Sequence, residues 1–454
     1  MDSLPHKSLV VNIANRTRLK ADFLWMLSGN VLYAACQWGI IVALAKLGTP
    51  EQVGEYALGM AVSAPIVLFA NFQLRALLAS DVNSQFTLSQ YLSFRFASLS
   101  GAMAVVAAVA IASQSLSFRA AMIVMVGLAQ ALEFVSDTYY GLMQKRERLD
   151  RISRSLMTKG PFSLGMLCLA MYLTHSVFWA VMGLMAGRLA ILLLWDSRLN
   201  FAAGPGNVFQ IERRFRFGWD PNAMARLLRA AAPLGIISML VSLNSSIPRY
   251  FVEAHLGSAE LGIFSAIVSL LTTGSLVVSA FGQSIFLPVA RACATFNRWK
   301  FRSYVVYAVA MGGLLGAGAV IAASLFGQSI LARIFRPEYG QRASVLVPLT
   351  IAGMMNFVAS GLGFIVTAAR SLRPQIPVLI ATAAASAGTA AFAVPRYGLY
   401  GAADASLAAA LIQLLGMAAI LFKVDRQLEA PSPVAAPLEP RVGPALQTAN
   451  VETT

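Results

Sequence analysis

Charged side chains within long apolar stretches are the residues of this sequence that could do chemistry. Arg75, Arg188 and Arg249 each lie in such a stretch. A charge in hydrocarbon costs roughly 2.5–3.5 kcal/mol on membrane-insertion scales. Each arginine is therefore expected to have a charged partner or to line a water-filled cavity. In such a cavity a guanidinium binds phosphate or carboxylate oxygens through two parallel hydrogen bonds.

Arg249 follows a proline inside a predicted helix. Pro248 removes a backbone hydrogen bond and frees the carbonyl of Asn244, which favours a kink there. An arginine at a kink that faces a water-filled cavity would bind a pyrophosphate or an acidic sugar. The alternative is an ion pair with Glu253, one turn further along the same helix.

The other embedded arginines have alternatives as well. Arg75, near the end of a predicted helix, can reach the membrane interface with its guanidinium or pair with Asp81. We expect Arg95 to reach the interface in the same way. Arg188 has no charged neighbour in the sequence. It must line the cavity or find a partner on another helix.

Two carboxylates lie one turn apart on one predicted helix face, Glu133 and Asp137. Such a pair can carry a coupling ion, a proton or sodium. It can equally neutralise Arg188 or Arg75 as structural ion pairs. Both alternatives stay open at the level of the sequence.

Uncharged polar residues form further stripes. Asn30, Tyr33 and Gln37 share one helical face, and we expect them, with Asn244, to line the cavity. An offset of 209 residues places Tyr33 opposite Ser242 of a later apolar stretch. The alternative for such small polar residues is helix packing.

The elements that position these residues are apolar helices. The chain is 57% hydrophobic, only 12% charged, and has a mean hydropathy of +0.67, whereas soluble domains are about 25% charged. Stretches of about 20 apolar residues can cross a bilayer. We therefore predict an all-α integral membrane protein with about twelve transmembrane helices at 23–47, 54–79, 91–112, 118–142, 155–174, 176–196, 227–252, 260–282, 303–325, 343–367, 375–394 and 399–422.

A repeated phrase divides these helices into halves. LGTPEQVGEYAL (47–58) and LGSAELGIFSAI (256–267) are 209 residues apart at the Leu-Gly and 208 apart at the second Gly. A repeat of this length indicates two homologous halves. Because each half has an even number of helices, the halves are parallel, with a pseudo-two-fold axis along the membrane normal.

The predicted organisation is therefore two six-helix lobes around a central cavity. Its parts are a cytoplasmic N-terminal segment (1–22), an N-lobe (23–196), a basic linker (197–225), a C-lobe (226–422) and a disordered tail (423–454). The stretch 284–302 is expected to form an amphipathic surface helix.

The distribution of basic residues gives the orientation. Of the 35 Lys and Arg residues, 25 fall in segments on one predicted side, including Lys159 in the loop 143–160, and six fall on the other. The positive-inside rule then places both termini in the cytoplasm. It also accounts for the net charge of +15 without a nucleic-acid partner.

Motifs of enzymes and metal sites are missing from the sequence. Cys36, Cys168 and Cys293 have no metal-ligand spacing, and no P-loop, HExxH or GxSxG is present. We expect no cofactor, no bound metal and no enzymatic activity.

Several phrases together resemble a known family. They are the hinge at 47–58, QKRERLD (144–150), NSSIPRYFVEAHLGSAELGIF (244–264), PVARACATFNRWKF (288–301), FRPEYG (335–340) and VPRYGLYGAADASL (394–407). The sequence resembles the polysaccharide exporters, or O-antigen-type flippases, of the multidrug/oligosaccharidyl-lipid/polysaccharide superfamily.

The resemblance implies alternating access at the bacterial inner membrane. The implied cargo is a polyprenyl-pyrophosphate-linked oligosaccharide, surrounded by membrane lipids and moved from the inner to the outer leaflet. With no nucleotide site, an ion gradient would drive it. A drug or cation antiporter of the same superfamily is the alternative, and it would need an acidic cavity. A membrane-embedded sugar polymerase is a weaker alternative, because such an enzyme would need a sizeable outer loop and the longest one here, 326–342, is short.

Overall fold

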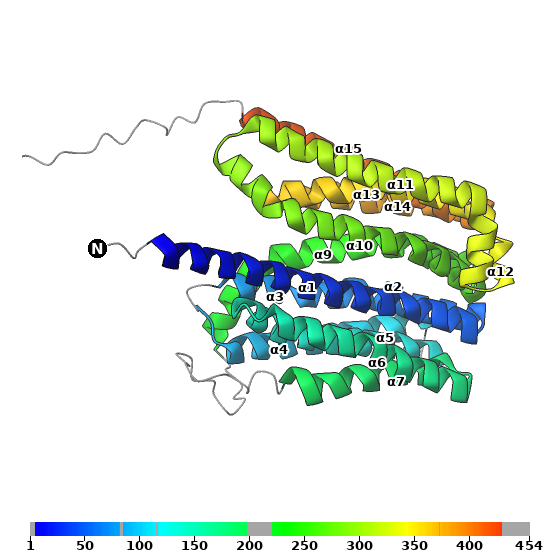
Figure 1. Ribbon diagram of the computed structural model, residues 1–454. Coiled ribbons are helices and arrows are strands. Elements are labelled where there is room, and N and C mark those ends of the chain that lie inside the picture. The colour runs from blue at the N-terminus through cyan, green and yellow to red at the C-terminus, as the bar shows by residue number, and fades with distance from the viewer. Residues whose placement is uncertain (1–4, 82–84, 115–116, 198–219, 372, 429–454) are drawn as a thin grey trace, which may run out of the picture.

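The computed structural model describes residues 5–81, 85–114, 117–197, 220–371 and 373–428, and these are almost entirely helical (Figure 1). Twelve helical segments are long and apolar enough to cross a membrane. Each coincides with one of the twelve predicted spans, so the helical fold class is confirmed. Among the described residues there is no β-strand.

The first half of the chain forms an N-terminal group of helices, which lies below the other helices in Figure 1. It consists of α1 (Pro5–Leu47), α2 (Pro50–Asn71), α3 (Leu74–Ser80), α4 (Leu88–Gln114), α5 (Phe118–Lys145), α6 (Leu149–Thr174), α7 (Val177–Ile191) and the π-helical turn η1 (Leu192–Asp196). Because α1 begins at Pro5, residues 5–22 belong to the same helix as the first predicted span.

The second half forms a C-terminal group. It consists of α9 (Pro221–Leu256), α10 (Ser258–Ala294), α11 (Arg298–Ile334), α12 (Pro337–Gly340), the 3-10 turn η2 (Ala343–Val345), α13 (Leu346–Ala368), α14 (Gln375–Tyr397) and α15 (Leu399–Gln427). Most of the predicted linker and the tail from 429 onwards lie outside the described residues.

The surface helix predicted at 284–302 is wrong. These residues form the end of α10 and the start of α11, with a turn between them. Val289, Ala292 and Phe301 are all buried in one apolar cluster of the C-terminal group. The stretch therefore packs against the core along one face, and that packing keeps both helices continuous.

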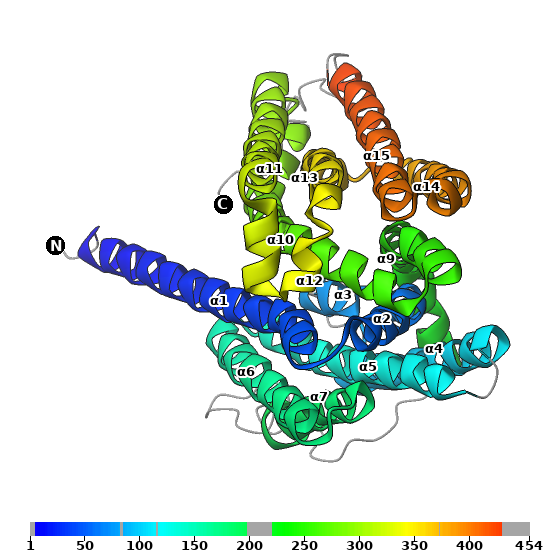
Figure 2. The same cartoon turned by 90° about the vertical axis from the view of Figure 1, so that its right-hand side faces the viewer.

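Both groups have the same orientation. In Figure 1, α1 begins and α15 ends at the left of the molecule, which we call the terminal end, and the opposite end is the distal end. Both copies of the repeated phrase lie at the distal end, at the α1–α2 and α9–α10 connections. Figure 2 looks onto this end.

The two connections are built differently. Thr49 caps α2 in a capping box with Gln52, and Pro50 occupies the first helical turn. The Gln52 side chain also donates to the carbonyl of His175 (2.8 Å), at the α6–α7 turn. In the second copy Gly257 alone joins the helices with a φ of +83°, a conformation that other residues adopt only with strain.

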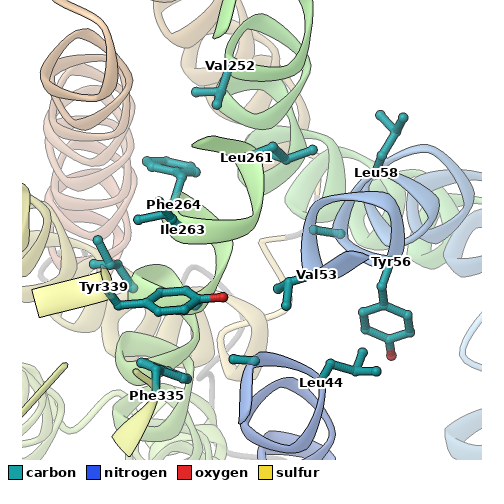
Figure 3. Close-up of a cluster of buried hydrophobic side chains, with 14 of the residues drawn as sticks. Leu44, Val53, Tyr56, Leu58, Val252, Leu261, Ile263, Phe264, Phe335 and Tyr339 are labelled. Carbon is teal, nitrogen blue, oxygen red and sulfur yellow. The ribbon is translucent and has the colours of Figure 1, made fainter. Parts of the chain in front are cut away.

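The largest apolar cluster lies at the distal end and joins the two groups. The cluster holds Leu44 and Val53 of the N-terminal group together with Leu261 and Phe264 of the C-terminal group, and Figure 3 shows the Tyr339 hydroxyl pointing toward Val53. A smaller cluster packs Leu227 at the start of α9 against α3 and α4. The other clusters lie within one group.

Candidate functional site

Four charged side chains meet inside the N-terminal group, and we call them the charge cluster: Glu133 of α5, Lys159 of α6, Arg188 of α7 and Asp196 of η1. Lys159 Nζ lies 3.1 Å from Asp196 Oδ2 and 3.9 Å from Glu133 Oε1. Arg188 Nε lies 3.6 Å from Glu133 Oε2. Lys159 and Asp196 are almost fully buried, at 1% and 0% exposure. Two cations balance two carboxylates, which reduces the cost of burying them.

Hydrogen bonds complete the charge cluster. Asp196 accepts hydrogen bonds from Ser155 and from Tyr140, the latter at 3.4 Å. Arg188 donates to the Ala129 carbonyl (2.7 Å) and to Gln37 Oε1 (3.1 Å). The Gln37 contact connects the cluster to α1.

A small pocket opens beside Arg188. It is lined by Tyr33, Cys36, Gln37, Ile40, Gly160, Ser163, Leu184 and Arg188. Gln37 donates to the Tyr33 hydroxyl, and Ser163 Oγ is buried without a hydrogen-bond partner in the described part of the chain. Three residues predicted to line the cavity, Tyr33, Gln37 and Arg188, thus lie together. Their pocket lies within the N-terminal group, between α1, α6 and α7.

Arg75 has the other predicted carboxylate as its partner. Its Nη1 lies 3.2 Å from Asp137 Oδ1, and its Nε donates to Gln144 Oε1 (3.2 Å). The expected alternative, a pair with Asp81, is not formed, because Asp81 accepts hydrogen bonds from Tyr91 and nearby backbone N–H groups. Glu133 and Asp137 therefore each have an arginine partner. This is the arrangement expected if the two carboxylates form structural ion pairs.

The prediction that Arg95 reaches the membrane interface is wrong. The side chain is fully buried and donates to the carbonyl of Asn71 (3.0 Å), to Asn71 Oδ1 (2.8 Å) and to Thr138 Oγ1 (2.9 Å). Asn71 is the last residue of α2, and helix C-termini leave carbonyls without intrahelical partners. Arg95 satisfies one of these carbonyls, and its charge complements the negative end of the helix.

Besides Arg75, three predicted cavity residues lie outside both the charge cluster and the pocket beside it. Asn30 is exposed, and its amide donates to the Met26 carbonyl one turn back (2.9 Å). Asn244 donates to the Leu379 carbonyl of α14 (3.4 Å), while its Oδ1 is buried and no described residue donates to it. The third is Arg249.

Arg249 Nε is buried without a hydrogen-bond partner among the described residues. The pair with Glu253, the alternative from the sequence, is not formed. Glu253 instead lies 3.3 Å from Arg119 Nη1 and accepts a hydrogen bond from Ser258 (2.9 Å). Next to Arg249, the Tyr250 hydroxyl donates to the Ala61 carbonyl of α2.

Two members of the charge cluster, Lys159 and Asp196, are not among the site residues predicted from the sequence. Lys159 was assigned to a loop, but it lies within α6 and its side chain is buried. A signal was available, because Ser155, Lys159 and Ser163 follow each other at intervals of four residues and form a polar stripe on one helix face. Asp196 stood at the end of a predicted span and gave no such signal.

No three His, Cys, Asp or Glu side chains gather as possible metal ligands within the part of the chain that the structure describes. The charge cluster itself is held together by ion pairs. A proton on Glu133 would leave Arg188 without a carboxylate partner beside the pocket.

Comparison with known proteins gives a consistent result. Residues 19–291 match the family model of polysaccharide biosynthesis proteins. The capsular polysaccharide biosynthesis protein CapF of Staphylococcus aureus is 27% identical over 389 residues, which cover 84% of this chain and 94% of that protein.

Solved structures share the fold. The lipid II flippase MurJ in an inward closed conformation superposes with a TM-score of 0.67 and 10% identity, over 89% of this chain and 90% of that one. An inward-facing multidrug resistance transporter of the MATE family, in the MOP superfamily, gives a TM-score of 0.61 and 11% identity, over 90% and 96%. The chain thus has the twelve-helix fold of multi-pass membrane transporters.

Proposed function

The chain belongs to the polysaccharide biosynthesis protein family, and from that premise we propose that it is a flippase for a lipid-linked oligosaccharide. The cargo would be a polysaccharide repeat unit on a polyprenyl pyrophosphate, moved across the bacterial inner membrane. The flippase fold and the capsular polysaccharide relative support this proposal. The protein would transport its cargo and would not act on it as an enzyme.

Arg249 is the observation that carries the proposal. A buried polar group without a partner costs roughly 1–3 kcal/mol, and more when it is charged. An anionic group that binds Arg249 would supply the missing partner. The pyrophosphate of a lipid-linked sugar has the charge and the oxygen geometry that a guanidinium binds.

The mechanism that we propose is alternating access. The sugar and pyrophosphate would cross between the two helix groups, while the polyprenyl tail stays among the membrane lipids. Arg249 lies on α9 next to Tyr250, which contacts α2 of the other group. A cargo bound there would touch both groups.

We propose that an ion gradient, of protons or sodium, drives the cycle through the charge cluster. Glu133 contacts both Lys159 and Arg188, so its charge sets the balance of the cluster. Arg188 passes that change to Gln37 of α1. Asp137 pairs with Arg75 and serves as the structural member of the carboxylate pair.

Transport in liposomes tests the flippase proposal. We expect purified protein to move a fluorescent polyprenyl-pyrophosphate oligosaccharide between leaflets, as measured by chemical quenching of the outer leaflet. Arg249→Ala should lower the rate at least tenfold, and Arg249→Lys should restore part of it, because lysine keeps the charge but loses the planar fork.

Arg396→Ala is the matched control. Arg396 is exposed, and it donates a hydrogen bond to the Phe392 carbonyl of its own helix. It should flip at the parental rate. Unchanged flipping by Arg249→Ala would reject the role of Arg249. If the parental protein moved no lipid while a related flippase did, the function itself would be rejected.

A cation-coupled drug antiporter is the second candidate, because the fold is also that of MATE transporters. The antiporter would be favoured if the protein exported a cationic dye from loaded vesicles and Arg249→Ala did not change that efflux. In cells, the flippase predicts that Arg249→Ala loses polymer and accumulates repeat units in the inner leaflet. Accumulation on the outer face would favour a polymerase.

A further inference from the structure

Two glycines allow α2 and α10 to cross at backbone contact. Gly54 is the fifth residue of α2, and Gly262 is the fifth residue of α10. A Cβ atom on Gly54 would lie 1.8 Å from the Ser258 carbonyl oxygen, and one on Gly262 would lie 2.0 Å from the Pro50 carbonyl oxygen. Both distances are far shorter than any Cβ contact that a protein can hold.

The crossing is reciprocal. Pro50 and Ser258 are the first residues of α2 and α10, so each glycine faces the first carbonyl of the other helix. The hydrogen that glycine carries in the Cβ direction points at that oxygen, as in the Cα–H···O contacts of closely packed helices. Both glycines belong to the repeated phrase, so its two copies contact each other.

We propose that this reciprocal glycine crossing is the closed gate at the distal end, and that Gly54 and Gly262 must separate in every transport cycle. The inference rests on the proposed alternating-access function. Because α2 belongs to one helix group and α10 to the other, the distal end cannot open while they touch.

The surroundings of the crossing fit a closed gate. Val53 and Leu261, beside the two glycines, are 1% and 0% exposed, and Tyr339 is fully buried against them (Figure 3). Burial raises the pKa of Tyr339 to about 12.

Two polar contacts join the groups at the same end. Arg119 of α5 pairs with Glu253 of α9 at 3.3 Å. Arg336, just before α12, donates to the Lys46 carbonyl at the end of α1 (2.8 Å). Figure 2 shows α1, α2, α10 and α12 meeting at this end.

Alanine at either glycine should prevent closure. The opposing atom is a helix carbonyl, which cannot move aside as a flexible side chain would, so the two helices must separate. By contrast, a Cβ on Gly101 or Gly313 would meet no atom within 4 Å. Gly101→Ala and Gly313→Ala are therefore matched controls for the same chemical change.

Labelling of a buried cysteine reports whether the gate is closed. In a background without the three native cysteines, Val53→Cys reports on Gly262→Ala, and Leu261→Cys reports on Gly54→Ala, so each reporter lies on the helix opposite the substitution. We expect labelling by a membrane-impermeant maleimide, added at the distal side, to rise several-fold over the parent and over both control variants. Labelling equal to the controls would overturn the inference.

Cross-linking provides a second measurement if the alanine variants fail to fold. Arg119→Cys with Glu253→Cys, joined by a short bifunctional thiol reagent, should hold the gate closed and block flipping until a cleavable linker is reduced. Arg342→Cys with Glu260→Cys is the matched control, because this ion pair lies within the C-terminal group. If flipping continues after complete cross-linking of the cysteines at 119 and 253, the inference that the distal end must open is wrong.

The labelling needs no cargo, so it separates this inference from the proposed function. A protein that opens and closes at the glycine crossing but moves no lipid-linked sugar would retain the gate and lose the flippase assignment. A protein that flips lipid while both alanine variants label like the controls would retain the flippase assignment and lose the gate.

Discussion

At the scale of single residues, pairing decides which charges the helices of this protein tolerate. Lys159 and Asp196 lie 3.1 Å apart with almost no exposure, and Ser155 and Tyr140 complete the contacts of Asp196. Arg249 is the contrast, since its Nε is buried without a hydrogen-bond partner and no carboxylate of the described chain forms an ion pair with it. Ion pairing thus separates Lys159 and Asp196, which balance each other's charge, from the residue that we assign to the cargo.

The Lys159–Asp196 pair makes a testable contribution to stability. Lys159→Met or Asp196→Asn alone leaves one buried charge without its partner, which should lower the free energy of unfolding by about 3–5 kcal/mol. The double variant removes both charges and should lose far less than the sum of the two. Thermal unfolding midpoints in detergent, combined in a double-mutant cycle, measure the coupling.

The control for this cycle is a pair near the surface. Arg148 and Asp150 lie 3.2 Å apart with side chains 43% and 25% exposed. Exposed pairs contribute at most about 1 kcal/mol, so neutralising them should barely change the midpoint. Additive effects of Lys159→Met and Asp196→Asn would contradict the coupling.

At the scale of elements, hydropathy was enough to predict the twelve helices but not the contacts between them. Apolar length is a local property, so every predicted span has its counterpart. The partner of Arg188 lies on another helix, 55 positions away, and only the packed structure brings Glu133 to it. Arg95 was mistaken for an interface residue for the same reason, because the end of α2 that it contacts is not its neighbour in the sequence.

Arg95 is expected to hold the end of α2 in place. Arg95→Leu removes the donors to the Asn71 carbonyl and side chain, leaving buried acceptors unsatisfied at a cost of about 1–3 kcal/mol. Amide hydrogen exchange should therefore become faster at the end of α2 and in α3. Arg396→Leu, at an exposed position, should leave exchange there unchanged, and equal exchange in both variants would argue against this role of Arg95.

At the scale of the whole molecule, the orientation in the membrane is still a prediction. The described chain begins and ends at the terminal end, and the positive-inside rule places that end in the cytoplasm. Alkaline phosphatase fused after Thr174, at the distal end, should be active because it folds in the periplasm. The same enzyme fused after Gln427 should be inactive, whereas green fluorescent protein fused there should fluoresce. The opposite pattern would reverse the membrane orientation and the direction of the proposed gate.

The repeat shows how far sequence reasoning reaches at this scale. The two phrases established that the halves correspond and that both hairpins lie at one end. They gave no sign that the copies touch, because two similar hairpins can equally lie far apart on a membrane surface. The contact became visible only through the Cβ distances at Gly54 and Gly262, which depend on how the two halves are docked.

The reciprocal form of the glycine crossing has a consequence for how such a protein arises. Residue-for-residue exchange of contacts is the pattern of an isologous interface, which two identical subunits form in a symmetric dimer. In a dimer of half-length chains, one substitution at this glycine would have altered both sides of the interface at once. In a single chain the two sides can differ, and the hairpins of this protein do, with Thr49 capping one helix and Gly257 joining the other pair. At the crossing itself, the first carbonyl of each helix still leaves no room for a side chain at the glycine of the other.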